Sequence, residues 1–102
     1  MFMANFIPQG VITAIVTPFK SDLEIDFDAF EHLIEFQIER NVDGIVVCGS
    51  TGESATLSHK ERLALIIKAI QISNGRVPII AGTGTNDTKA TIELSTLAKS
   101  EG

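Results

Sequence analysis

Three continuous apolar runs, each followed by a helical pattern, constrain the fold of this chain more than any other feature. The runs span residues 11–16, 45–48 and 77–81. They do not alternate with polar residues, which is typical of parallel strands covered on both faces. Their starts recur about every 33 residues, the length of one β-α unit. We therefore predict the order β-α-β-α-β-α and assign the chain to the α/β class.

The segments that follow the runs carry helix signals. Apolar residues recur there at helical spacing, namely Phe27, Phe30, Ile34 and Ile38, then Leu63, Ile66, Ile67 and Ile70, then Ala90, Leu94, Leu97 and Ala98. Each stripe has cap or stop residues beside it, namely Asp26 for the first, Ser58 with Glu61 and Asn74-Gly75 for the second, and Asp87 or Thr88 for the third.

Composition narrows the class of protein. The chain has 102 residues and a formal net charge of −5, which argues against binding to the phosphate backbone of nucleic acids. No apolar run approaches the roughly 20 residues that span a bilayer, and residues 1–6 lack the basic start of a signal peptide. One cysteine and no cluster of Cys and His residues give no disulfide and no metal site. We expect a cytoplasmic protein without metal, membrane or nucleic-acid partners.

Three parallel strands make a poor independent sheet, because both edge strands keep unpaired backbone groups. We therefore expect residues 1–102 to be the N-terminal part of a longer domain. A dinucleotide-binding half-domain is the alternative for this size. Its glycine fingerprint is absent after the first run, and Asp87 stands where the third glycine after Gly82 and Gly84 would be. We discount that alternative.

The segment with the most chemistry is Gly49-Ser50-Thr51-Gly52-Glu53, which directly follows the second run. It places two hydroxyls between two glycines at the carboxyl end of a predicted strand, where α/β proteins locate their active sites. Backbone N–H groups can turn outward in such a loop, and glycine allows close approach. The loop therefore suits a small carboxylate or phosphate.

Residues 10–19, 49–57 and 80–86 resemble the dihydrodipicolinate synthase family, a branch of the pyruvate-dependent class I aldolases that include N-acetylneuraminate lyase. The resemblance implies a (β/α)₈ (TIM) barrel, of which this chain would supply the first three βα units. One departure concerns the branch. The synthases usually carry two threonines between the glycines, whereas Ser50-Thr51 is the form common in the lyases.

The resemblance also implies a reaction. A lysine on a later strand forms a Schiff base with pyruvate, and the enamine attacks an aldehyde co-substrate, aspartate semialdehyde, without a cofactor. Thr51 would hold the pyruvate carboxylate through its hydroxyl and N–H. Ser50 would relay protons, and Gly49 and Gly52 would serve backbone conformation through positive φ or close approach. Glu53 would fix the loop by accepting hydrogen bonds at its carboxylate. The full-length enzyme would be a homotetrameric lyase of lysine and diaminopimelate biosynthesis.

The chain itself lacks the covalent machinery of that reaction. It has no tyrosine, and none of its lysines stands in an apolar run that would lower its pKa by desolvation. We expect all of these lysines to be solvated, namely Lys20, Lys60, Lys68, Lys89 and Lys99. The fragment alone should therefore position substrate without turning it over.

The resemblance finally implies a regulatory site. Many synthases bind lysine as a feedback inhibitor, and Ser54, Ala55, His59 and Asn86 match that pattern. Arg62 and Ala90 stand where lysine-sensitive members tend to carry histidine and glutamate. A fixed cation and a missing carboxylate should weaken the binding of a cationic ligand, so we expect weak or absent inhibition by lysine.

Two other functions stay open. Ser50 favours a sialic-acid or 2-keto-acid aldolase of the same superfamily. The chain lacks the Schiff-base lysine and the tyrosine of the reaction. This absence favours a module of a different class, which would bind a small anion without catalysis.

Overall fold

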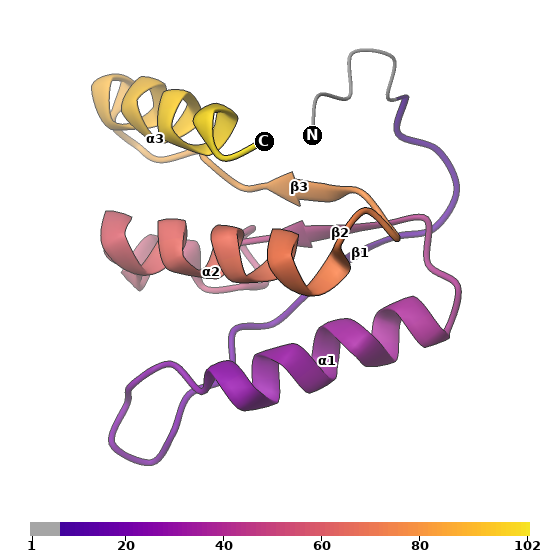
Figure 1. Cartoon of the computed structure of the whole chain (residues 1–102). Coiled ribbons are helices and arrows are strands. Elements are labelled where there is room, and N and C mark those ends of the chain that lie inside the picture. Colours follow the sequence, from indigo (N-terminus) through magenta and orange to yellow (C-terminus); the bar gives the residue numbers. More distant parts are fainter. Residues whose placement is uncertain (1–6) are drawn as a thin grey trace.

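The computed structural model of the protein describes residues 7–102. Its elements follow the predicted order (Figure 1): β1 (Ile12–Ala14), α1 (Phe27–Glu39), β2 (Gly44–Val47), the 3₁₀ turn η1 (Ser54–Thr56), α2 (His59–Ser73), β3 (Ile79–Ala81) and α3 (Thr88–Ser100). The α/β class and the three βα units are therefore confirmed. The segment 1–6, which we expected not to be a signal peptide, lies outside the described residues.

The three strands form one parallel sheet in the order β1-β2-β3. Thr13 pairs with Ile45, and Val46 pairs with Ile80. Because the strands are parallel, the loops that follow them leave from the same edge of the sheet. We call this edge, at which the strands end, the carboxyl edge.

Strands β1 and β3 are shorter than their apolar runs, and β2 is as long as its run but begins and ends one residue earlier. Cys48, which we expected in the second strand, has φ 60° and already belongs to the loop after β2. Pro78 lies just before β3 and has no N–H to donate, but its carbonyl accepts a hydrogen bond from Ile45 N at 3.1 Å. The runs thus correctly locate the strands, while local turns shorten the hydrogen-bonded ladders.

The predicted helix caps are confirmed. Asp26 accepts a hydrogen bond from Ala29 N at 3.0 Å at the start of α1. Ser58 and Glu61 form both bonds of a capping box at the start of α2. Asn74 ends α2 in the left-handed conformation. For α3 the structure selects Asp87, whose side chain accepts a hydrogen bond from Lys89 N.

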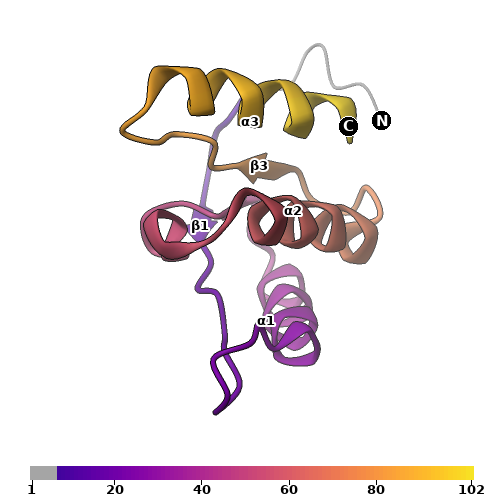
Figure 2. The same cartoon turned by 90° about the vertical axis from the view of Figure 1, so that its left-hand side faces the viewer.

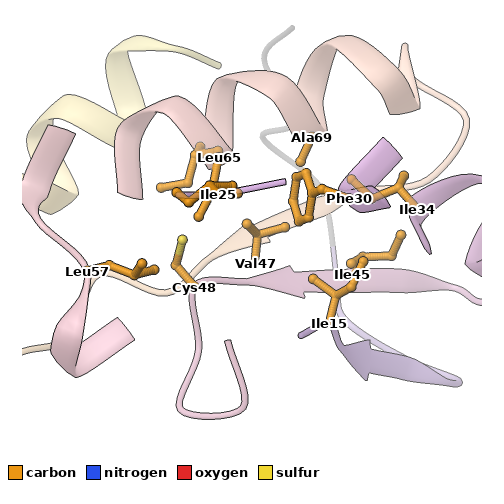
Figure 3. Close-up of a cluster of buried hydrophobic side chains, with 11 residues drawn as sticks. Ile15, Ile25, Phe30, Ile34, Ile45, Val47, Cys48, Leu57, Leu65 and Ala69 are labelled. Carbon is orange, nitrogen blue, oxygen red and sulfur yellow. The ribbon is translucent and has the colours of Figure 1, made fainter. Parts of the chain in front are cut away.

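The core lies between the sheet and helices α1 and α2. Phe30 and Ile34 of α1, Leu65 of α2, and Ile45 and Val47 of β2 are fully buried there (Figure 3). In the views of Figures 1 and 2, α2 runs between α1 and α3. The core therefore fixes β2 and α2 relative to each other, and the loop that joins them is the motif-bearing segment.

The opposite face of the sheet and its two edges are uncovered within residues 7–102. Val46 alternates with the buried Ile45 and Val47 and is only half-buried, and Val16 is 48% exposed. In the described sheet β1 and β3 each pair only with β2. Across residues 7–102, the helices are too short or too polar to cross a lipid bilayer.

Candidate functional site

The loop between β2 and α2 lies at the carboxyl edge, where a residue after β1 bonds to the loop and a residue after β3 bonds to the end of β2. Thr17, which follows β1, donates its hydroxyl to the carbonyl of Gly52 at 2.8 Å. Gly82, which follows β3, donates its N–H to the carbonyl of Val47 at 2.7 Å. The structure therefore brings the loops after all three strands together. Ser50 and Thr51 belong to the middle loop, which follows β2.

The loop backbone folds into consecutive tight turns. Gly52 N donates to Gly49 O at 3.1 Å, and Glu53 N donates to Ser50 O at 3.0 Å. Positive φ angles fall on Cys48 (60°) and Glu53 (61°), whereas neither Gly49 nor Gly52 has one. Of the two reasons we expected for these glycines, positive φ or close approach, positive φ therefore applies to neither.

Close approach explains Gly52 instead. A Cβ atom there would lie 3.2 Å from the carbonyl oxygen of Ile15 and 3.3 Å from the backbone nitrogen of Cys48. These neighbours are backbone atoms of the sheet edge and cannot move aside easily. A glycine at this position lets the loop lie directly against the ends of β1 and β2.

The side chains of Ser50 and Thr51 are exposed. Within residues 7–102, no hydrogen bond uses either hydroxyl or the N–H of either residue. Two hydroxyl donors and two backbone N–H donors are thus available on adjacent residues at the carboxyl edge. Such a set of donors can bind a carboxylate, because each carboxylate oxygen accepts more than one hydrogen bond.

Glu53 supports the loop in a different way from the one predicted. Its side chain is exposed and makes no capping hydrogen bond to the 3₁₀ turn η1. Its backbone carbonyl accepts hydrogen bonds from the N–H of Thr56 at 3.1 Å and from the Thr56 hydroxyl at 3.2 Å. Among residues 7–102 the hydrogen bonds of Glu53 come from its backbone, in a left-handed conformation, and the anchoring role of its carboxylate stays a prediction.

Cys48 is the first residue of the loop after β2, and it is buried. It is 1% exposed, and desolvation raises the pKa of its thiol to about 11 against a smaller opposing effect of the Arg62 charge. A thiol with this pKa is neutral at physiological pH. Cys48 is therefore a packing residue rather than a nucleophile.

The lysines are placed as expected with one qualification. Lys68 of α2 is half-buried, and the other four are exposed, namely Lys20, Lys60, Lys89 and Lys99. None lies in a strand or in the loop between β2 and η1. His32 and His59 are both exposed.

Residues 48–53, between β2 and η1, are called the site loop. A cavity of about 430 Å³ lies next to this loop, between the starts of α2 and α3. Its lining includes all four residues of the predicted regulatory site, Ser54, Ala55, His59 and Asn86. Arg62 and Ala90, the two departures from the lysine-binding pattern, line the same cavity. The structure thus brings these residues together, and the identity of a ligand stays a prediction.

Two residues of the site were missed or misread from the sequence. Thr17 follows the first apolar run and carries no sequence signal of a site residue, yet it is buried and bonded to the site loop. Arg62 was considered only as a charge facing a ligand, yet it is 4% exposed and bonded to backbone carbonyls. Its spacing from Leu65 and Ile66, at i+3 and i+4, could have indicated that it lies on the buried face of α2.

Comparisons with known proteins agree with the motifs. The sequence model of the Dihydrodipicolinate synthetase family matches residues 7–102. The 4-hydroxy-tetrahydrodipicolinate synthase of Maridesulfovibrio salexigens is 53% identical over 94 residues, which are 92% of this chain and 32% of the relative.

Two solved structures are similar in fold and in sequence. The chloride-inhibited dihydrodipicolinate synthase from Acinetobacter baumannii, complexed with pyruvate, is 47% identical with a TM-score of 0.90. The synthase from Cyanidioschyzon merolae with lysine bound is 39% identical with a TM-score of 0.86. The matches cover 92% and 90% of this chain, respectively, and 32% of each solved chain.

The chain thus spans about a third of the length of its relatives, and its three βα units correspond to part of their TIM barrel. The match covers nearly the whole chain, and it includes the loop with Ser50 and Thr51. The chain belongs to the dihydrodipicolinate synthetase family.

Proposed function

We propose that this chain is the N-terminal part of a lyase that condenses pyruvate with aspartate semialdehyde, and that its loop between β2 and η1 binds the carboxylate of pyruvate. One observation carries the proposal. Ser50 and Thr51 present hydroxyl and N–H donors without partners among residues 7–102, at the carboxyl edge of the sheet. The pyruvate complex of the Acinetobacter baumannii relative supports the choice of ligand.

Thr51 and Ser50 have different roles in this proposal. Thr51 donates its hydroxyl and its N–H to the carboxylate, which fixes pyruvate with its keto carbon facing the interior of the barrel. Ser50 passes protons to and from the reacting atoms, because a hydroxyl both donates and accepts. Gly49 and Gly52 let the loop fold tightly enough for both residues to face the same ligand.

The covalent step belongs to a lysine outside residues 1–102. An amine attacks a ketone only when it is unprotonated, and a solvated lysine with an ordinary pKa near 10.4 is almost wholly protonated at pH 7. No lysine of this chain lies in a strand. The complete site needs the remaining βα units, and we place the full-length enzyme in the cytoplasm as a homotetramer.

Ser50 supports a second candidate, a sialic-acid or other 2-keto-acid aldolase of the same superfamily. Both candidates use pyruvate in the same loop, so the aldehyde distinguishes them. Turnover with aspartate semialdehyde but not with an N-acetylated amino sugar supports the synthase. A module that binds a small anion without catalysis is the alternative of a different class, and it would bind pyruvate without forming a Schiff base.

The predicted weakness of lysine inhibition concerns the 430 Å³ cavity. The lysine-bound relative from Cyanidioschyzon merolae shows that a family member binds this ligand. In this chain a cationic ligand would meet the guanidinium of Arg62 and would find alanine at position 90. We expect lysine at millimolar concentration to leave the rate of the full-length enzyme nearly unchanged.

The substitution Thr51→Val in the full-length protein tests the proposed carboxylate site. It keeps the shape of the side chain and removes the hydroxyl. A hydrogen bond to a charged group contributes about 1.5–3 kcal/mol, so kcat/KM for pyruvate should fall by roughly 10- to 100-fold. Thr96→Val is the matched control, because Thr96 is exposed on α3 and bonds only to Ile92 O. A normal response to pyruvate in Thr51→Val would remove Thr51 from the site.

A further inference from the structure

Arg62 is a buried charge without an acidic partner. Its side chain is 4% exposed. The one salt bridge among residues 7–102 joins Arg76 to Glu35, so no carboxylate neutralises Arg62 within that range. Removing a cation from water without such a partner costs free energy. The hydrogen bonds of the guanidinium should therefore explain why an arginine is buried at this position.

The guanidinium of Arg62 holds two backbone carbonyls. Its Nε and Nη2 atoms donate to Ser54 O at 3.2 and 2.7 Å. Its Nη1 atom donates to Gly84 O at 3.2 Å. Ser54 is the first residue of η1, directly after the site loop, and Gly84 lies in the loop after β3. One side chain on α2 therefore joins two loops of the carboxyl edge.

The site loop is thus anchored at two points on either side of Glu53. Thr17 holds Gly52 O at 2.8 Å from the β1 side, and Arg62 holds Ser54 O from the α2 side. The N–H of Ser54 also returns to Gly49 O at 3.4 Å. A shift of Ser54 therefore displaces the turn that presents Ser50 and Thr51.

We propose that Arg62 is a positioning residue, which fixes the Ser50-Thr51 turn for pyruvate through its paired hydrogen bonds to Ser54 O and its bond to Gly84 O. The role depends on the planar fork of guanidinium, because several donors in fixed directions reach both carbonyls at once. A lysine ammonium on a flexible stem cannot reproduce this arrangement. The inference rests on the proposed function of the loop.

The test uses Arg62→Met and Arg62→Lys in the full-length protein. Methionine keeps much of the buried apolar volume and removes every donor, whereas lysine keeps the charge. Arg76→Met is the control, since Arg76 lies next to the opposite edge of the sheet and bonds to Glu35, Ile72 O and Ser73 O. Hydrogen exchange of the amides of residues 52–54 and the kinetics with pyruvate are measured for each variant.

In Arg62→Met we expect the amides of residues 52–54 to exchange faster. The amides of the buried α2 residues Leu65 and Ala69 should exchange at an unchanged rate. The KM for pyruvate should rise by about tenfold or more, with a smaller change in the KM for the aldehyde, because misplacement by about 1 Å costs that much. Arg62→Lys should recover part of both effects. Arg76→Met should show neither.

Two results would overturn the proposal. Unchanged exchange at residues 52–54 in both Arg62 variants would show that Arg62 does not hold the loop, whatever the loop binds. Faster exchange with an unchanged pyruvate KM would show that the loop position does not matter for pyruvate. Thr51→Val, measured in parallel, separates the two proposals. If it impairs the response to pyruvate and Arg62→Met does not, only the positioning role fails, and if neither variant does, the proposed function fails as well.

Discussion

Leu23 is the exposed residue whose backbone carries the clearest strain outside the site. It has φ 72° and is 80% exposed, in the turn that leads from Phe19 to Ile25. Its N–H donates to Lys20 O at 2.9 Å, which holds the turn closed. The left-handed conformation costs a residue with a Cβ atom about 1–2 kcal/mol. This cost brings no burial in return within residues 7–102.

We predict that Leu23→Gly stabilises the protein. Glycine adopts φ 72° without steric cost, and part of the gain is offset by the greater freedom of the unfolded chain. The free energy of unfolding should rise by about 0.5–1 kcal/mol, measured by urea titration of the full-length protein. Leu23→Ala is the control, because it shortens the side chain but keeps the strained Cβ. An equal gain in both variants would assign the effect to the side chain and not to the backbone.

Cys48 gives a second prediction at this scale, which concerns pH. Burial raises the pKa of its thiol from an ordinary value near 9.0 to about 11. The folded state therefore keeps the proton more tightly than the unfolded state. This contribution to stability is complete below pH 9 and is lost as the pH rises towards 11.

The measurement is the free energy of unfolding at several pH values between 8 and 11, in the wild type and in Cys48→Ala. The fall with pH should be shallower in Cys48→Ala, because other titrating groups are shared by the two proteins. A thiol reagent should also label Cys48 slowly at pH 8 unless the protein is unfolded. Rapid labelling of the native protein at pH 8 would show that the thiol is neither buried nor protonated.

At the scale of elements, the sequence predicts helix ends well because caps are local. Ser58 bonds to Glu61 only three residues away, and the pair could be identified without any tertiary information. Strand ends depend on partners elsewhere in the chain. Cys48 continues an apolar run, which indicates a strand, but its φ is 60° and the distant Gly52 and Gly82 pack tightly against its backbone.

The capping box of α2 is a quantitative test of this local control. Ser58→Ala removes the acceptor for Glu61 N and should lower the free energy of unfolding by about 1 kcal/mol. Ser58→Asp keeps an acceptor and should be nearly neutral. Thermal or urea unfolding of the full-length variants measures both. Equal losses in the two variants would mean that capping does not explain the role of Ser58.

The site was predictable only in part, because some of its contacts depend on residues far away in the sequence. The spacing of Ser50 and Thr51 between two glycines located the loop, and the apolar run before it located the edge. The bonds of Arg62 depend on how α2 meets the loop after β3, over 22 residues of separation to Gly84. No local pattern contains that information. The sequence also could not indicate that Glu53 bonds to Thr56 through its backbone carbonyl, because this bond depends on the left-handed conformation of Glu53.

At the scale of the whole molecule, the described sheet is open on one face and at both edges. Ala14 of β1 is exposed and its partner Val46 of β2 is only half-buried, and β1 and β3 each pair only with β2. In relatives of about three times the length, further chain is available to cover such surfaces. Unpaired edges and exposed apolar faces promote association.

We predict that the isolated 102-residue chain associates or remains partly ordered. Size-exclusion chromatography with light scattering should show species larger than a monomer, and thermal melting should be broad. The full-length protein serves as the control and should melt cooperatively. A monodisperse monomer with a sharp two-state melt would show that the three units form a stable fold by themselves.

The central claim is that this chain positions pyruvate but does not supply the covalent nucleophile. Borohydride reduction in the presence of pyruvate, followed by mass spectrometric mapping of the modified lysine, tests it most directly. The full-length protein should carry one pyruvyl adduct on a lysine outside residues 1–102, and the isolated chain should carry none. A stoichiometric adduct on Lys20, Lys60, Lys68, Lys89 or Lys99 would contradict the account.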